Sequence, residues 1–343
     1  MATSRWIDTD AYSAQLRDAS INLEAKRLLI ARIAGSEQEK DLTVPPNCRG
    51  FGRIRHFRRS TAIGWPSNGL PLDPACKALR IDFTDVLQAQ AFQNAACNWR
   101  CWYCYVPFNL LAALRDNSGW FSAEELVDMY MAEDDPPRVL DLTGGQPDLI
   151  PEWVPWTMQA LNDRHLDRRT FLWSDDNLST DYLWRFLSDS DLALLEAYPN
   201  YGRVGCFKGF DAESFAFNTK AAPSLFDRQF EIMDRLLRSG IDTYAYATFT
   251  TPSVESRAVA DAMKTFVDRL QAIDEHLPLR TVPLEIRVFS PVAPRMHELQ
   301  RIALEGQTLA IEAWNLEVER RYPAQERNMR ICDVQVASRR AAE

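Results

Sequence analysis

The sequence predicts an α/β protein built on a partial, TIM-like (β/α)6 barrel, with a helical and irregular extension before it. From about residue 78 onward, short apolar segments alternate with longer amphipathic segments through six repeats. Strand–helix alternation at this spacing is typical of βαβ units and a parallel sheet. Six repeats, where a closed barrel has eight, indicate an open barrel whose ligands bind at the carboxyl ends of its strands.

Composition and charge narrow the class of protein. The 343 residues are 46% hydrophobic and 25% charged, as in ordinary globular proteins. No run approaches the roughly 18 apolar residues of a membrane span, and Met1–Trp6 lacks the apolar core of a secretory signal. The seven cysteines are odd in number and unevenly spread, so we expect a reducing cytoplasm. A net charge of −9 argues against a general nucleic-acid binder.

The first 77 residues form the predicted extension. Residues 10–35 are rich in Ala, Leu, Ile and Arg, which predicts one or two amphipathic helices ending at Gly35. Residues 44–74 contain five prolines and little periodicity, so irregular chain is expected there. The predicted barrel covers residues 78–295, and residues 296–343 form a C-terminal helix and tail.

A basic segment, residues 49–59, lies inside the irregular region. It has five arginines and no acidic residue, although the chain as a whole is acidic. Arginine forks bind carboxylate and phosphate groups, so the segment could clamp an anionic substrate such as a phosphate, a nucleotide or an acidic peptide. The alternative is a solvated basic surface, and the sequence leaves both interpretations open.

The elements of the barrel follow from local patterns. The predicted strands are 79–83, 138–142, 170–174, 203–207, 243–249 and 284–289. A capping box at Ser122–Glu125 predicts the start of a helix. Apolar residues at helical spacing predict two more, around 226–237 and 259–270. Further helices are expected at 106–114, 152–161 and 295–320.

Three of the seven cysteines, Cys97, Cys101 and Cys104, fall within eight residues at CxxxCxxC spacing. Soft thiolates select iron–sulfur clusters, zinc or Cu(I). A closed zinc site or an electron-transfer cluster normally has four protein ligands. Three cysteines would leave one iron of a cuboidal cluster open to a substrate or cofactor. The alternative is three unrelated buried cysteines.

The octet Cys97–Cys104, with the aromatic Tyr103 before its last cysteine, resembles the signature of the radical S-adenosylmethionine (radical SAM) superfamily. The resemblance implies a [4Fe–4S] cluster held by the three cysteines, with S-adenosylmethionine bound at the open iron. It implies reductive cleavage of that cofactor to a 5′-deoxyadenosyl radical, which takes a hydrogen from a substrate. An electron donor such as flavodoxin or ferredoxin is then expected.

Two loops that follow predicted strands extend the resemblance. Thr143-Gly144-Gly145-Gln146-Pro147 is similar to the Gly-Gly-Glu-Pro motif of the superfamily, which contacts the amino group of the cofactor, with Gln146 in place of the glutamate. Asp175 and Asn177 resemble a motif of the activase-like branch, whose aspartate touches the ribose. Each loop also has a structural interpretation, as a strand–helix turn and as a helix cap respectively.

Two further residues are implied by the activase-like resemblance. Lys208 corresponds to a lysine near the cofactor, with Cys206 where that branch has an acid. His297 corresponds to a histidine near the ribose, although it could equally be an exposed residue at a helix start. Val288 and Phe289 would lie near the adenine or in the core.

The resemblance covers about residues 78–295, but residues 84–96 form a longer segment before the cysteines than is usual in the superfamily. The substrate remains open between a protein or peptide and an anionic small molecule. A non-catalytic iron–sulfur or zinc protein, used for electron transfer or interaction, is the alternative function. It would require a fourth protein ligand.

Overall fold

The computed structural model describes residues 6–62 and 64–336. Most of the amino-terminal segment expected to lack a secretory signal, Met1–Arg5, lies outside the described residues, as do the last seven residues of the predicted tail. The strands of the main sheet are β3 (Gly52–Arg58), β4 (Val86–Gln93), β6 (Val139–Thr143), β7 (Phe171–Asp176), β8 (Tyr201–Phe207), β9 (Thr243–Thr248) and β10 (Thr281–Leu284). A smaller sheet contains β1 (Ile21–Asn22), β2 (Arg27–Ala31) and β5 (Ser118–Ser122).

The α-helices are α1 (Thr9–Ser20), α2 (Leu72–Leu79), α3 (Ala123–Met131), α4 (Trp153–Asp163), α5 (Tyr182–Phe186), α6 (Asp189–Ala197), α7 (Ala212–Thr219), α8 (Phe226–Arg238), α9 (Ser256–Ile273), α10 (Glu298–Arg321) and α11 (Ala324–Arg327). Within the described residues, no helix combines the length and the apolar content that crossing a bilayer requires.

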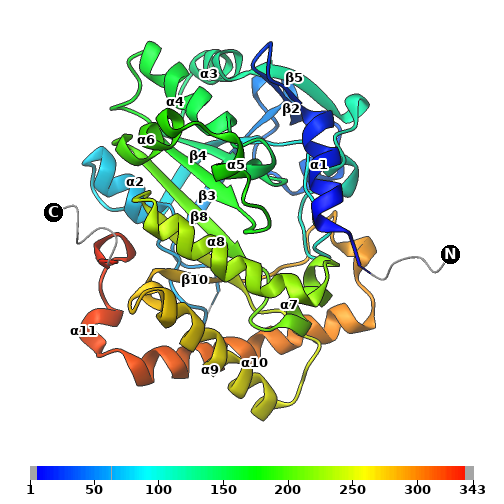
Figure 1. Ribbon diagram of the computed structural model, residues 1–343, viewed down its shortest axis with the longest axis vertical. Helices are drawn as coiled ribbons and strands as arrows, with labels where there is room; N and C mark the ends of the chain where they lie inside the picture. The colour runs from blue at the N-terminus through cyan, green and yellow to red at the C-terminus, as the bar shows by residue number, and fades with distance from the viewer. Residues whose placement is uncertain (1–5, 63, 337–343) are drawn as a thin grey trace.

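The main sheet has the strand order β10-β9-β8-β7-β6-β4-β3. The six strands from β4 to β10 are parallel, and β3 pairs with β4 in the antiparallel direction at one edge. The sheet curls without closing, and helices such as α8 and α9 cover its outer face (Figure 1). The predicted partial (β/α)6 barrel is therefore confirmed, with one extra antiparallel strand.

Alternate residues of each strand face the inside of the curled sheet. Toward the amino ends of the parallel strands these residues are apolar. Together with Phe57 of β3 they form one buried cluster, which includes Ala89, Val139, Phe171, Val204, Tyr244 and Val282. Toward the carboxyl ends the same face carries polar side chains, namely Gln93, Thr143, Asp175, Lys208 and Thr248. We call this polar end the mouth of the barrel.

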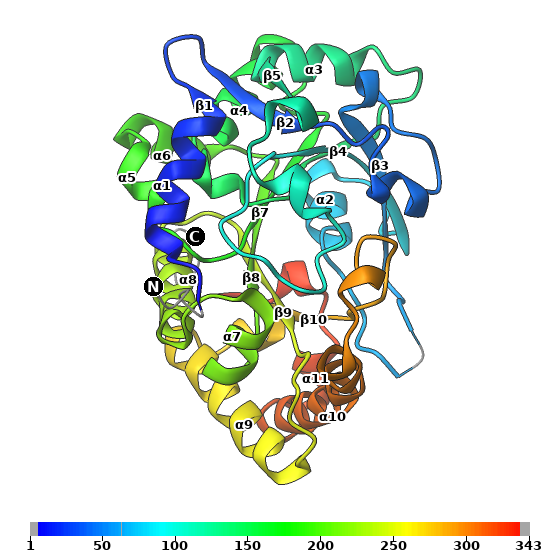
Figure 2. The same cartoon turned by 90° about the vertical axis from the view of Figure 1, so that its right-hand side faces the viewer.

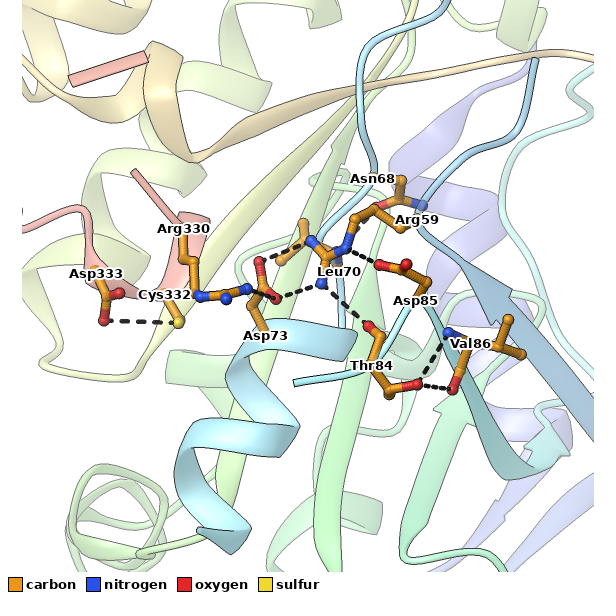
Figure 3. A network of polar contacts seen from close by, with 10 residues as sticks. All are labelled: Arg59, Asn68, Leu70, Asp73, Thr84, Asp85, Val86, Arg330, Cys332 and Asp333. Atoms are coloured by element: carbon orange, nitrogen blue, oxygen red, sulfur yellow. Dashed lines mark hydrogen bonds and ion pairs between the residues drawn. The ribbon is translucent and has the colours of Figure 1, made fainter. Parts of the chain in front are cut away.

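The opposite end, which we call the base, is closed by α2 and by a network of charged residues (Figure 3). Arg59 lies at its centre, with its guanidinium 2.7 Å from Asp73 and 2.8 Å from Asp85. Arg330, from the C-terminal segment, lies 3.8 Å from Asp73. A cavity of about 830 Å³ lies beside this network and is lined in part by Trp314 of α10.

The predicted extension contributes more regular structure than expected. Residues 10–35 form α1 and then the antiparallel strands β1 and β2. Residues 28–31 are all buried, so this part of the segment lacks the polar face of an amphipathic helix. The basic segment, expected to be irregular, supplies β3. Figure 2 shows α1 beside α8, where Arg228 binds Asp10 at 2.5 Å.

The predicted strand at 79–83 is wrong. Leu79 ends α2, and the first barrel strand is β4, at 86–93. The polar residues Gln88 and Gln90 hide the strand pattern of β4, although Gln90 is buried and hydrogen-bonded to Asn47. Only residues 94–96 separate β4 from the cysteines, so the segment that looked too long is largely the strand itself.

Two other element predictions are also corrected. The strand expected at 284–289 is instead at 281–284, where it pairs with β9. Val288 and Phe289 are 48% and 40% exposed, so they do not belong to the core. The helix expected at 106–114 is only a 3-10 turn at Phe108–Leu111, because Ala113 has a positive φ of 53°. The remaining predicted strands and helices are confirmed to within a few residues, including the capping box of α3.

Candidate functional site

The cysteine octet forms a loop directly after β4, at the mouth of the barrel. Cys97 is 9% exposed, and Cys101 and Cys104 are partly exposed. Burial raises the pKa of the Cys101 thiol to about 12, Lys208 acts in the opposite direction, and the neighbouring Cys97 and Cys104 raise it further. The three thiols thus lie close enough to influence one another, around one region of the mouth.

The loop is held from outside by α1. Asn98 donates hydrogen bonds to the hydroxyls of Ser13 in α1, at 2.9 Å, and of Ser179, at 2.8 Å. The indole of Trp99 donates to the hydroxyl of Thr9 at 3.2 Å. The sequence does not predict these contacts, because α1 lies in the extension, outside the residues that the resemblance covers.

The other side of the loop is held by α7 and β9. The backbone and the indole of Trp102 both donate to Asn218, at 3.1 and 3.0 Å. The hydroxyl of Tyr103 is 2.8 Å from that of Thr248. Tyr103, predicted to lie near the cofactor, is 9% exposed, and its hydroxyl is already bonded at the mouth.

Arg295 fixes the chain just after the last cysteine. Its guanidinium donates to the carbonyls of Cys104, at 2.7 Å, and of Val106, at 3.2 Å. The same group lies 3.7 Å from the ring centroid of Phe108. His297, predicted near the ribose, is exposed at the start of α10, and in the described part of the chain its side chain makes no hydrogen bond or ion pair.

The paired glycines allow the loop after β6 to pack against the loop after β4. Gly144 and Gly145 have positive φ angles of 67° and 60°. A β-carbon on Gly145 would lie 2.3 Å from the carbonyl oxygen of Ala96, and one on Gly144 would lie 2.0 Å from the side chain of Gln93. Both positions therefore require glycine, since a side chain would collide with the segment that carries the cysteines.

Gln146 is fully buried and joins three loops at the mouth. Its amide nitrogen donates to Asp176 at 2.7 Å, and its amide oxygen accepts from the backbone of Asn177 at 2.9 Å. Its backbone N–H donates to the carbonyl of Ala96 at 2.7 Å. Asp176 also lies 3.2 Å from Arg203. A glutamate at position 146 would add a second carboxylate against Asp176, which explains the neutral side chain here.

Asp175 and Asn177 extend from the end of β7 toward this region. The hydroxyl of Thr143 donates to one oxygen of Asp175, and the other oxygen is buried without a partner among the described residues. Asn177 donates to Asn98 at 3.0 Å and lies 3.9 Å from the sulfur of Cys97. The structure thus brings Thr143, Asp175 and Asn177 together at the mouth.

Lys208 lies at the end of β8, close to the thiols. Burial acts to lower its pKa, but the adjacent Cys206, Cys101, Cys97 and Cys104 outweigh burial and raise it above its usual value. Within the described residues its ammonium group has no hydrogen bond or ion pair. Cys206 itself faces the inside of the barrel and is 8% exposed.

The inward side of β3 adds two arginines that face the same interior. Arg55 binds Asp141 at 3.0 Å and lies 3.8 Å from Asp175. Arg53 donates to the hydroxyl of Tyr105 at 2.5 Å. Burial raises the pKa of Asp141 to about 7, although Arg55 and Arg53 act to lower it. Two arginines of the basic segment therefore line the interior, while Arg49 and Arg58 are exposed.

The three thiols of Cys97, Cys101 and Cys104 are the donor set that the mouth offers to a metal centre. Among the described residues, no three His, Cys, Asp or Glu side chains are arranged to hold one metal ion. In a cuboidal cluster each thiolate binds its own iron, so the sulfurs lie further apart than around one ion. Three thiols around one region, with an ammonium group and a carboxylate oxygen that lack partners among the described residues, are groups that could hold such a cluster and a zwitterionic cofactor.

Comparison with known proteins gives weak matches. No protein-family model and no curated protein matches the chain. SuiB of Streptococcus suis bound to its precursor peptide SuiA is 15% identical with a TM-score of 0.38, over 53% of this chain and 36% of SuiB. SuiB bound to S-adenosylmethionine is 16% identical with a TM-score of 0.37, over 52% of this chain and 36% of SuiB.

A third structure, histidine-tagged anSMEcpe with bound AdoMet, is 12% identical with a TM-score of 0.35, over 56% of this chain and 59% of that protein. The chain therefore spans little more than a third of SuiB and under two thirds of anSMEcpe. Matches of this size carry no conclusion about the function of this chain.

Proposed function

We propose that this protein is a radical SAM enzyme. The observation that carries the proposal is the convergence of Cys97, Cys101 and Cys104 with Lys208 at the mouth of a partial (β/α)6 barrel. The three cysteines would hold a [4Fe–4S] cluster. When bound, the cluster would supply the electron that cleaves S-adenosylmethionine to a 5′-deoxyadenosyl radical, and the radical would take a hydrogen from the substrate.

The residues around the thiols have roles that their contacts support. The ammonium group of Lys208, which lacks a partner among the described residues, would bind the carboxylate of the cofactor. The free oxygen of Asp175 would accept hydrogen bonds from the ribose hydroxyls. Gly144 and Gly145 would keep the loop after β6 close to the cysteine segment, and Tyr103, bonded to Thr248, would contact the cofactor from the cysteine loop.

The finer assignment to the activase-like branch rests on Asp175, Asn177 and Lys208. All three lie at the mouth, while His297 is exposed at the edge of this region. Among the described side chains inside the barrel and at its mouth, three are cationic (Arg53, Arg55 and Lys208) and two are carboxylates (Asp141 and Asp175). This balance favours an anionic small molecule over an uncharged peptide segment as the substrate. Reduction would come from a flavodoxin or a ferredoxin.

Anaerobic reconstitution with iron and sulfide, followed by dithionite and S-adenosylmethionine, tests this function. We expect release of 5′-deoxyadenosine and a change in the electron paramagnetic resonance spectrum of the reduced cluster on addition of the cofactor. Cys101→Ala should reduce nucleoside release to background, because one iron ligand is lost.

The matched control is Cys332→Ala, since Cys332 is a buried cysteine at the base, remote from the mouth. It should retain cluster absorbance and nucleoside release. A cluster whose spectrum does not respond to the cofactor, with a fourth protein ligand on the remaining iron, would instead identify an electron-transfer protein.

A further inference from the structure

Arg53 is a buried cation without an anionic partner. It is 6% exposed, and among the described residues no carboxylate lies within ion-pair distance of its guanidinium. Other buried arginines, such as Arg203 and Arg280, each bind a carboxylate. A buried charge is costly unless it is paired, so the surroundings of Arg53 are complete only when an anion is present.

The side chain of Arg53 faces the inside of the barrel. Arg53, Arg55 and Phe57 share one face of β3, and Phe57 belongs to the interior apolar cluster. The charge of Arg53 also acts on Asp141 of β6. Asp141 is already bound by Arg55 at 3.0 Å, so it does not serve as the partner of Arg53. Because Arg55 offsets its negative charge, Asp141 does not strongly repel an incoming anion.

Tyr105 supplies a second donor beside this cation. Its hydroxyl accepts a hydrogen bond from Arg53 at 2.5 Å, and the guanidinium carbon lies 5.0 Å from the centroid of its ring. The hydroxyl proton has no acceptor among the described residues. The buried Nε of Arg53 has no partner there either. An N–H and an O–H group are therefore both available to one anionic ligand.

This pair lies beside the cysteine loop and next to a partly exposed aromatic residue. Tyr105 directly follows Cys104. The ring of Phe289, which is 40% exposed, packs against Tyr105 with ring centroids 6.4 Å apart. An anion bound by Arg53 and Tyr105 would hold the rest of its molecule next to the three thiols.

We propose that Arg53 and Tyr105 bind an anionic group, a carboxylate or a phosphate, of the substrate inside the barrel. This inference rests on the proposed function, since it assigns the substrate class to the same site. A planar guanidinium can make two parallel hydrogen bonds to either group, which a lysine cannot do. Within the basic segment, Arg53 therefore binds the anion, because Arg55 is paired with Asp141. The exposed Arg49 and Arg58 belong to the surface.

Calorimetric titration of the reconstituted enzyme, with S-adenosylmethionine present, tests the proposal. The probes are inorganic phosphate and succinate at low ionic strength. We expect at least one of them to bind, and Arg53→Gln to weaken its binding by about tenfold or more, because a charge-assisted hydrogen bond is lost. Binding of phosphate alone identifies a phosphate ester as the substrate class, and binding of succinate alone identifies a carboxylate.

Two further variants distinguish a specific loss of anion binding from a general loss of positive charge and from misfolding. Arg58→Gln removes an exposed arginine on the other face of β3 and should leave binding unchanged. Tyr105→Phe removes only one hydroxyl and should weaken binding severalfold with the fold intact. Equal binding to wild type and Arg53→Gln, no binding of either probe, or equal losses in Arg53→Gln and Arg58→Gln would overturn the proposal.

Nucleoside release keeps the two hypotheses apart. If anion binding depends on Arg53 but the wild type releases no 5′-deoxyadenosine, the proposed function fails and the anion site stands. If the wild type releases the nucleoside but Arg53→Gln binds both probes normally, the anion site fails and the proposed function stands.

Discussion

Two arginines of the basic segment lie at opposite ends of the barrel, and their surroundings differ. At the base, Arg59 makes paired hydrogen bonds to Asp73, at 2.7 and 3.2 Å, and a third to Asp85 (Figure 3). At the mouth, the guanidinium of Arg53 hydrogen-bonds to one side chain among the described residues, that of Tyr105. One run of like charges therefore serves two purposes. Where the buried charge is matched the residue holds the fold together, and where it is unmatched a ligand is expected.

Replacing arginine by glutamine at the base and at the mouth should give the largest difference in the free energy of unfolding. Arg59→Gln leaves Asp73, which is 2% exposed, without its main cationic partner, and we expect a loss of about 3 kcal/mol in the free energy of unfolding. Arg53→Gln removes an uncompensated charge and one hydrogen bond, so its effect should stay within about 1 kcal/mol. Urea denaturation of the ligand-free proteins measures both. Similar losses in the two variants would show that Arg53 is as structural as Arg59.

A smaller loss of stability is expected from changes at Gln146, whose side-chain amide nitrogen and oxygen are both hydrogen-bonded at the mouth. Gln146→Glu places a carboxylate against Asp176 and should cost about 2 kcal/mol of stability near pH 8. The repulsion raises the pKa of the new carboxyl in the folded state, so the loss should shrink as the pH falls toward 5.

Gln146→Met, of similar size and uncharged, is the control for Gln146→Glu. It removes the hydrogen bonds without adding charge, so its loss should not vary with pH. A pH-independent loss in Gln146→Glu would contradict repulsion from Asp176.

The smallest expected effect on stability concerns Asp141, which lies inside the barrel between the mouth and the base. Burial raises its folded-state pKa to about 7, above an ordinary value of about 3.9. The native state then holds a proton that the unfolded state loses, so this contribution to stability is present at low pH and is lost as the pH rises through 7.

Asp141→Asn should lack this dependence of stability on pH, because an asparagine side chain does not titrate. Between pH 6.5 and 8, the free energy of unfolding of the wild type should fall by about 1 kcal/mol relative to the variant. Denaturation at a series of pH values, in constant salt, gives the comparison. A wild type that gains stability relative to Asp141→Asn over this range would mean that Arg55 outweighs burial.

Much of the barrel could be predicted because its strands are short apolar runs separated by helices with one clear apolar face. The two barrel strands that were misplaced show where this signal fails. In β4, Gln88 and the buried Gln90 interrupt the apolar pattern, and the hydrogen bonds between Gln90 and Asn47 join residues that are distant in sequence. Near β10, the alternating residues 284–289 resemble a strand, but only 281–284 find a neighbouring strand with which to pair.

The candidate site was predictable where residues are close in sequence, and less so where they come together only in the fold. The cysteine spacing and the paired glycines identified two loops of the mouth. The sequence could not separate Arg53 from Arg58, because which side chain faces inward depends on the pairing of β3 with β4. It also gave no signal for Arg295, whose contacts with the cysteine loop join residues almost two hundred positions apart.

The contacts of Thr9 and Ser13 with the octet have a practical consequence for anyone who trims this protein. A shortened version that starts after residue 20 would keep every proposed iron ligand and every strand of the barrel, yet it would lose α1 and with it the hydrogen bonds to Asn98 and Trp99. Such a version should express as a folded but colourless protein. Amino-terminal deletions are therefore a poor starting point for crystallisation of the loaded form.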